Sequence, residues 1–235
     1  MKLYKFLPKK YFNAFFNHGS LKLGTIYDFK DEIKHTAARG DSSEGLKVIR
    51  RQLDGTPIHL KHGEYTDVLS DVFSGNVTIM GTGSVSSQRC CNDAFIFCSS
   101  NEFTEELFLL WYNDSIKSGT SDLTDSCYEI FDVQNFFSAI SLAIKHKATP
   151  LYGDNITYTT DPIPHNDFAA KLHPAMTKEI NEYGWQKENR SIWQPIKYEI
   201  ITPWVLDIPA AREFCRPFAF LSKDDNKDKI HYILS

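Results

Sequence analysis

The segment WQKENRSIW, residues 185–193, brings together the polar side chains with the clearest chemical potential in this sequence. If the segment is a strand, its two-residue period places Gln186, Glu188 and Arg190 on one face. A carboxylate is costly to bury alone, so we expect Glu188 to face solvent, to pair with a cation, or to lie in a cleft where its charge is used. The spacing fits either a catalytic acid or an ion pair with Arg190 on a sheet face.

A second candidate is the segment FIFCSSN, residues 95–101, where an apolar run ends in Ser99 and Ser100. Such a run predicts a strand buried on both faces. The end of a buried strand often carries ligand-contacting groups, because a rigid scaffold meets a cleft there. Either serine could instead cap the helix that follows. Trp111 and Tyr112, on the next element, could wall an aromatic pocket or pack in the core.

The charged segment DFKDEIKHTAARGDSSEG, residues 28–45, lacks a sustained apolar face. We expect a long surface loop, and loops of this length in compact domains are often functional. Arg39 could bind a pyrophosphate through both ends of its guanidinium, with Asp41 and Glu44 holding it in place. The alternative is a hydrated turn.

Basic residues gather in the segment LKVIRRQLDGTPIHLKHG, residues 46–63. Lys47, Arg50, Arg51 and Lys61 could form a phosphate-binding stripe for nucleic acid. A solvated face of a β-hairpin is the more frequent reason for such a pattern.

The composition indicates one folded domain over residues 1–235. Of these residues 42% are hydrophobic and 14% aromatic, which is enough to bury a core. The net charge of −4 excludes a chain that binds nucleic acid over its whole surface. No apolar run reaches the roughly 20 residues of a membrane-spanning helix, so we expect neither membrane insertion nor secretion.

Several common chemistries are not indicated by the motifs. The five cysteines are odd in number and form no repeated C-x-x-C, so we expect reduced thiols, a cytoplasmic protein and no zinc site. The histidines are scattered, and no metal site is expected. The sequence contains no G-x-S-x-G, no P-loop and no H-E-x-x-H motif.

Hydrophobic periodicity predicts the elements that must position these groups. Strands are expected at 3–6, 20–25, 94–98, 127–131, 151–158, 185–193, 198–206 and 229–234, with a hairpin region over 46–90. Helices are expected after Pro8, after Thr104 and after Asp132, and residues 168–183 are rich in helix formers. The chain is therefore predicted to be a single α+β domain, with mixed or antiparallel sheets and a few helices.

The order of these segments resembles the ADP-ribosyltransferases. The resemblance rests on LYKF in the first strand, LKLGT ending the second, FCSS ending a central strand, and QKE on a late strand. It covers most of the chain. Four segments are also similar to a family of uncharacterised bacterial and phage proteins, which has DNA-modifying ADP-ribosyltransferase toxins as distant relatives. These segments are GTIYDFKDEI, RGDSSEG, FIFCSSNEF and WQKENR.

The resemblance implies an NAD site and a role for each matching residue. Glu188 would be the catalytic acid and Gln186 a substrate-orienting group. Lys5 stands where such enzymes carry His or Arg. Its ammonium group lacks both the planar set of donors of a guanidinium and the hydrogen-bond acceptor of an imidazole. Tyr27 could stack on the nicotinamide ring or be a core tyrosine with its hydroxyl at the surface. The expected NAD-binding set is Lys5, Tyr27, Arg39, Ser99, Ser100, Tyr112 and Arg190.

The hypothesis is therefore an NAD-dependent ADP-ribosyltransferase-like effector or toxin in bacterial or phage conflict, acting on a protein or nucleic-acid acceptor. There are two alternatives. One is a non-enzymatic binding module on the same fold, which Lys5 favours, and the other is a nuclease-type toxin, which the basic stripe favours. If NAD binds, Glu188 and Ser99 should face one cleft, and the segment 28–45 should border it.

Overall fold

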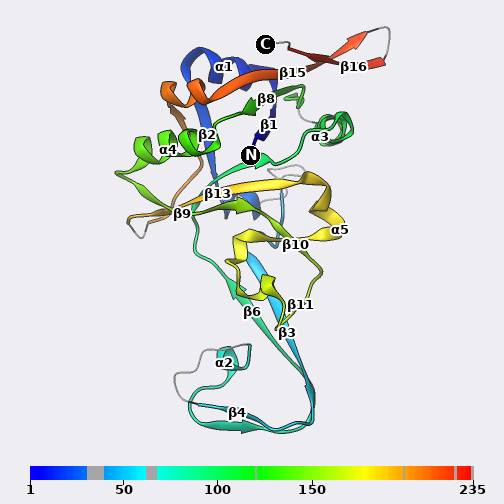
Figure 1. The fold of residues 1–235 in the computed structure, drawn as a ribbon, viewed down its shortest axis with the longest axis vertical. Helices are drawn as coiled ribbons and strands as arrows, with labels where there is room; N and C mark the ends of the chain where they lie inside the picture. The colour runs from blue at the N-terminus through cyan, green and yellow to red at the C-terminus, as the bar shows by residue number, and fades with distance from the viewer. Residues whose placement is uncertain (31–39, 62–67, 120, 198, 225–226, 234–235) are drawn as a thin grey trace. The chain divides into compact units, whose positions relative to one another are not determined.

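The computed structural model describes residues 1–30, 40–61, 68–119, 121–197, 199–224 and 227–233 (Figure 1). Helices and strands both occur, in several sheets, so the α+β class is confirmed. Contacts group the chain into two compact units. The first holds Met1–Glu44, Asp93–Ile156 and Trp185–Ser235, and the second holds Gly45–Asn92 and Thr157–Gly184. The prediction of one domain over the whole chain stays a prediction.

The first unit is built on one large sheet with the strand order β14-β2-β7-β1-β8-β15-β16, in which β13 also pairs with β7 and β9 with β13. Its strands are β1 (Leu3–Leu7), β2 (Ser20–Thr25), β7 (Phe95–Ser100), β8 (Ser126–Ile130), β9 (Ala148–Asn155), β13 (Glu188–Pro195), β14 (Trp204–Asp207), β15 (Cys215–Asp224) and β16 (Lys227–Tyr232). Its helices are α1 (Lys9–His18), α3 (Glu105–Lys117) and α4 (Val133–Ile144), with short 3-10 turns at Asp28–Lys30, Gly184–Gln186 and Pro209–Phe214.

Local signals explain where these helices begin and end. The hydroxyl of Thr104 accepts from the N–H of Leu107 at the start of α3, and the carboxylate of Asp132 caps α4. Gly19 ends α1 with φ 77°, where an added Cβ would lie 2.5 Å from the backbone of Ile208. The predicted helix starts after Thr104 and Asp132 are thus confirmed.

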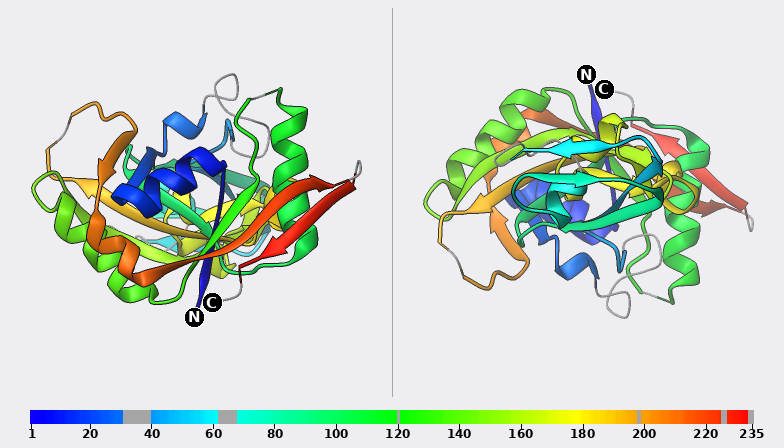
Figure 2. Two further views of the ribbon diagram at one scale, coloured as in Figure 1. Left: turned by 90° about the horizontal axis from the view of Figure 1, so that it is seen from above. Right: turned by 90° about the horizontal axis from the view of Figure 1, so that it is seen from below.

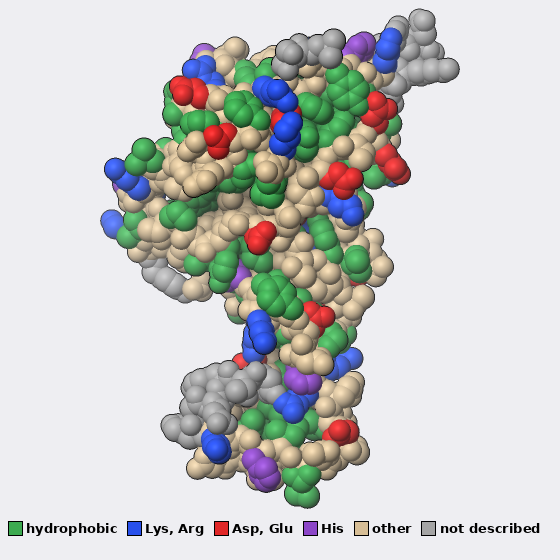
Figure 3. All heavy atoms as spheres, in the orientation of Figure 1, with side chains coloured by type: hydrophobic (Ala, Val, Ile, Leu, Met, Phe, Trp, Pro, Cys, Tyr) green, Lys and Arg blue, Asp and Glu red, His purple; other side chains and the backbone are tan. Residues whose placement is uncertain are grey.

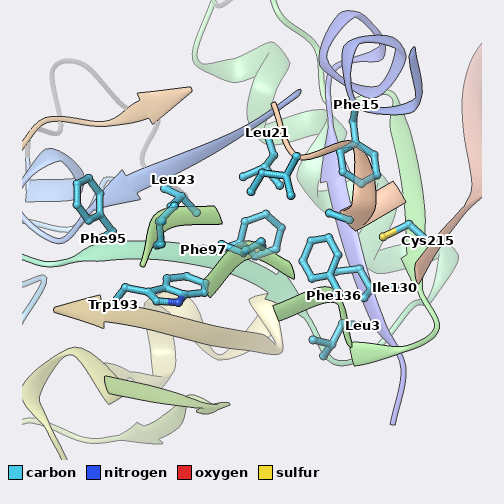
Figure 4. Close-up of a cluster of buried hydrophobic side chains, with 14 of the residues drawn as sticks. Leu3, Phe15, Leu21, Leu23, Phe95, Phe97, Ile130, Phe136, Trp193 and Cys215 are labelled. Carbon is cyan, nitrogen blue, oxygen red and sulfur yellow. The ribbon is translucent and has the colours of Figure 1, made fainter. Parts of the chain in front are cut away.

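The main core covers one face of this sheet, which we call the α4 face and define by Phe97, Ser99, Ser191 and Trp193. The buried side chains there come from α1, α4 and the central strands, and Figure 4 shows Phe136 of α4 among them, close to Phe97. The opposite face, defined by Cys98, Ser100, Glu188 and Arg190, is called the Glu188 face. The alternation of side chains along β7 and β13 separates the two sets.

A smaller core lies on the Glu188 side, where α3 packs through Phe108 and Tyr112. β16 lies beside α3 in both views of Figure 2, and the hydroxyl of Tyr232 donates to Glu105 at 2.8 Å. None of the helices in the described ranges is long and apolar enough to cross a membrane.

The second unit is centred on a ladder in which all nine residues of β3 (Leu46–Asp54) pair antiparallel with β6 (Thr82–Cys90). The remaining elements are β4 (Ile58–Leu60), α2 (Val68–Val72), β5 (Val77–Ile79), β10 (Thr157–Thr159), β11 (Ile163–Pro164), β12 (Thr177–Glu179) and α5 (Ile180–Tyr183), with 3-10 turns at Phe168–Lys171 and Pro174–Met176. A small core, with Ile49, Val68 and Leu69 at its centre, holds this unit together.

Three predicted elements differ from the structure. The strand expected over 198–206 is much shorter, because among the described residues there only Trp204–Asp207 (β14), just after Pro203, pairs as a strand. Residues 168–183 form two 3-10 turns, a short strand and one helical turn in place of a helix, because Pro174 begins a new turn that the imidazole of His173 caps. The strand expected from Trp185 begins at Glu188, since residues 184–186 form a 3-10 turn and Lys187 has φ 49°. The sequence analysis did not predict α2 or β15.

Candidate functional site

The site is organised by the alternation of side chains along β13. Glu188 lies opposite Ser100 of β7, and Arg190 lies opposite Cys98, so all four side chains belong to the Glu188 face. The prediction that Glu188 and Arg190 share one face is confirmed. Gln186 precedes the strand, in the 3-10 turn, and its side chain is buried.

Glu188, Arg190 and Glu44 form a buried charged cluster, which we call the triad. The Arg190 Nε donates to Glu188 Oε1 at 2.6 Å, and its Nη2 donates to Glu44 Oε2 at 2.7 Å while Nη1 donates to Glu44 Oε1. The side chains of Glu44 and Arg190 are each 1% exposed, whereas that of Glu188 is 7% exposed. Glu188 is therefore the member of the triad that reaches solvent most.

Two carboxylates share one guanidinium, so the formal charge of the triad is −1. Burial by itself would lower the pKa of Arg190, but the carboxylates of Glu188 and Glu44 raise it well above its usual value. The neighbouring thiol of Cys98 responds in the same sense: burial, reinforced by the charge of Glu188, raises its pKa to about 12. Cys98 is thus a thiol of low reactivity.

The start of β13 is held in a strained conformation. Lys187 has φ 49°, a left-handed value that is uncommon for a residue with a Cβ. The hydroxyl of Ser100 lies 3.0 Å from the carbonyl oxygen of Gln186 and 3.1 Å from that of Lys187, and the N–H of Asn101 donates to the same Lys187 carbonyl at 2.8 Å. Ser100 thereby fixes the turn that presents Glu188.

The expectation that Glu188 and Ser99 face one cleft is wrong. Ser99 pairs with Asn189 on the α4 face, because neighbouring residues of a strand point to opposite sides. Lys5 also lies away from Glu188: its ammonium donates to the carbonyl oxygen of Cys98 and lies 4.7 Å from the centre of the Phe97 ring. Cys98 lies on β7 between Ile96, which pairs with β2, and Ser100, which pairs with β1.

Two of the expected residues, Ser100 and Arg190, share the face with Glu188, and Tyr4 lies there in place of the expected Lys5. Tyr4 lies opposite Ser100 on one side and opposite Glu129 on the other, and Glu129 lies opposite Arg216. A row of side chains therefore crosses five strands: Glu188, Ser100, Tyr4, Glu129 and Arg216. No sequence pattern pointed to Tyr4 or Glu129. The only signal that could have found them was the alternation of side chains along each strand, which decides the residues that share a face.

An aromatic pair lies on the same side as this row. The rings of Trp111 and Trp185 are 4.8 Å apart, and Phe6 lies 6.4 Å from Trp111. The indole N–H of Trp111 is buried and has no hydrogen-bond acceptor among the described residues. Tyr112, by contrast, packs in the α3 core and is 4% exposed, which is the alternative that the sequence left open.

The segment 28–45 is anchored at both of its described ends. The ring of Phe29 covers Gly24, where an added Cβ would lie 2.7 Å from it. Glu44 binds Arg190, so this end of the segment reaches the Glu188 face. Tyr27 is 48% exposed, with the ammonium of Lys30 lying 4.5 Å from its ring centre. Arg39 lies outside the described residues.

The four basic residues of the second unit do not form one stripe. Lys47 is buried and donates to the carbonyl oxygens of Ala169, Ala170 and Leu172, so its expected role in binding nucleic acid is wrong. Arg50 and Arg51 are adjacent on β3 and point to opposite faces.

The last of the four, Lys61, is exposed. On the face drawn in Figure 3, Lys and Arg side chains are dispersed among acidic, apolar and uncharged ones.

A hollow of about 800 Å³ opens on the α4 face, between α4 and the strands β9 and β13. Phe137, Ser138 and Ser141 line it from α4, and Tyr152 and Trp193 line it from the strands. It contains no residue of the triad. Within the described ranges, no group of three or more His, Cys, Asp or Glu side chains could hold a metal ion.

Comparisons with protein-family models, with curated proteins and with solved structures find no match. The function must therefore be argued from the residues of the site.

Proposed function

We propose that this chain is an NAD-dependent ADP-ribosyltransferase-like effector or toxin that acts on a protein or nucleic-acid acceptor, with Glu188 as the catalytic carboxylate and with an NAD site on the Glu188 face that does not include Ser99 or Lys5. One observation carries the proposal: the triad is buried, has a formal charge of −1, and exposes Glu188 more than its other members. A carboxylate held at a fixed position in a site with little water stabilises positive charge that develops beside it.

The reaction would use this charge at one step. The bond between the ribose C1′ and the nicotinamide nitrogen breaks, and nicotinamide leaves with the electron pair of that bond. Positive charge develops on the ribose, and the carboxylate of Glu188 stabilises it across a poorly hydrated site. An oxygen or nitrogen of the acceptor then attacks C1′ and loses its proton to solvent. Gln186, buried beside Glu188 in sequence, would orient the substrate.

The test compares Glu188→Gln with the parent protein by nicotinamide release. The amide keeps the side-chain size and removes the charge, so the rate should fall about a hundredfold or more while NAD affinity changes little. Glu213→Gln, at an exposed position outside the site, is the matched control and should keep the parent rate. Equal rates for the parent and Glu188→Gln would contradict the proposal.

A non-enzymatic binding module is the second candidate, because both carboxylate oxygens of Glu188 already contact Arg190, at 2.6 and 3.3 Å. The hollow on the α4 face would then be the binding surface. In that case neither protein releases nicotinamide, and NAD leaves the melting temperature of both unchanged. The nuclease-type alternative loses support, since Lys47 is buried.

A further inference from the structure

We propose that Glu44 is a positioning residue, which sets the orientation and the effective charge of Glu188 through the guanidinium of Arg190. The effect of Glu44 on rate rests on the proposed function, but its effect on the Glu188 carboxylate does not.

The geometry divides the guanidinium between two carboxylates. Glu44 takes the edge formed by Nη1 and Nη2, with Nη2 to Oε2 at 2.7 Å. Glu188 takes the other edge, from Nε at 2.6 Å and from Nη2 at 3.3 Å. A planar guanidinium that is fixed along one edge presents the other edge in one orientation. Glu44 therefore determines where Arg190 holds Glu188.

Backbone hydrogen bonds hold the turn that carries Glu44. The N–H of Glu44 donates to the carbonyl oxygen of Asp41 at 2.8 Å, and the carboxylate of Asp41 accepts from the N–H of Ser43 at 2.8 Å. The N–H of Asp41 in turn donates to the carbonyl oxygen of Phe29 at 2.8 Å, and the Phe29 ring packs on Gly24 of β2. Glu44 is thus carried on a turn that is tied to the same sheet as Arg190.

The charge of Glu44 also changes what Glu188 can do. With Glu44 ionised, Arg190 is shared and the triad keeps a charge of −1. Without that charge, Arg190 would neutralise more of the charge of Glu188, which would then attract a developing cation less strongly. Among the described residues, other titratable groups near Arg190 are the thiol of Cys98, the exposed carboxylate of Asp154, which lies opposite Arg190 on β9, and, further away, the ammonium of Lys5.

The experiment measures the titration of the Glu188 carboxyl directly, by ¹³C NMR of glutamate-labelled protein, with Glu188→Gln used to assign its signal. In Glu44→Gln the midpoint should fall by about one to two pH units, because a like charge has been removed from a shared cation. Glu44→Asp keeps the charge on a shorter side chain, so its Glu188 midpoint should stay close to that of the parent. This variant is measured in place of Glu44→Gln if Glu44→Gln does not fold. Glu213→Gln should leave the midpoint unchanged.

Nicotinamide release is measured on the same proteins. Glu44→Gln should lower the rate about tenfold or more and move the acidic limb of the pH–rate profile to lower pH. An unchanged Glu188 midpoint overturns the inference, whether or not the parent turns over NAD. If the parent does turn over NAD, a shifted midpoint with an unchanged rate overturns it as well. Absence of turnover in the parent, together with a shifted midpoint, contradicts the proposed function and leaves the positioning role of Glu44 supported.

Discussion

Replacing Arg190 by methionine should be among the most destabilising single changes in the first unit. The substitution leaves Glu44 and Glu188 buried without their shared cation, at side-chain exposures of 1% and 7%. Removing one partner of a buried ion pair costs about 3–5 kcal/mol. Since two carboxylates lose their partner here, we expect the upper part of that range at pH 7, a large share of the roughly 5–15 kcal/mol that stabilises a domain.

The loss should depend on pH with a defined sign. In Arg190→Met, burial and mutual repulsion raise the folded-state pKa of the two carboxyls above the unfolded value of about 4.3. The folded protein then binds more protons than the unfolded chain between these pKa values, so stability is present below about pH 4 and is lost as the pH rises through the folded pKa. Arg190→Met should therefore be less stable at pH 7 than at pH 5, relative to the parent at each pH.

Urea unfolding followed by circular dichroism at both pH values measures this difference. The control is a charge-free triad, Glu44→Gln with Arg190→Met and Glu188→Gln, which should recover much of the stability at pH 7 because no buried charge is left unpaired. A loss below about 1 kcal/mol that does not change with pH would refute the reasoning, since that is the behaviour of a solvent-exposed pair.

Two further changes test the packing of each unit. Between pH 8 and 10.5 the free energy of unfolding of the parent should increase by about 1–3 kcal/mol relative to that of Lys47→Met, because burial lowers the folded pKa of Lys47 from 10.5 to about 8 and the unfolded chain then binds more protons; the buried thiols, whose raised pKa values act in the opposite sense, are common to both proteins and cancel in this difference. Gly24→Ala should cost about 1–3 kcal/mol in thermal unfolding, since the new Cβ would lie 2.7 Å from the Phe29 ring, whereas Gly153→Ala, with its nearest contact at 3.4 Å, should cost under about 1 kcal/mol.

Local patterns in the sequence predicted the elements of the sheet better than they predicted the site. The apolar run ending in Ser99 and Ser100 does form a buried strand, and the two-residue period does place Glu188 and Arg190 together. Which serine shares their face depends on the register between β7 and β13, and no residue pattern within either strand specifies that register.

The partner of Arg190 could not be found from spacing either. Glu44 lies 146 residues before Arg190, in a segment whose charges also suit a hydrated turn. Only the folded sheet brings the two side chains together. The same limit explains Tyr4 and Glu129, which reach the row through the pairing of β1 with β7 and β8, while the resemblance to a known family pointed to Lys5.

The presence of the triad in a core position is itself an argument about function. Three apolar side chains of similar volume would fill this space at little cost, and replacing buried ion pairs in that way is often neutral or stabilising by about 1–4 kcal/mol. Stability alone therefore does not explain why Glu44, Arg190 and Glu188 are charged. An arrangement that holds two carboxylates on one guanidinium at a strained strand start, with the Glu188 side chain 7% exposed, would be explained if a carboxylate there acted on a cationic species. If the charge-free triad is as stable as the parent but no longer releases nicotinamide, the charges serve the reaction; if it is as stable and equally active, they serve neither purpose, and the catalytic assignment of Glu188 fails.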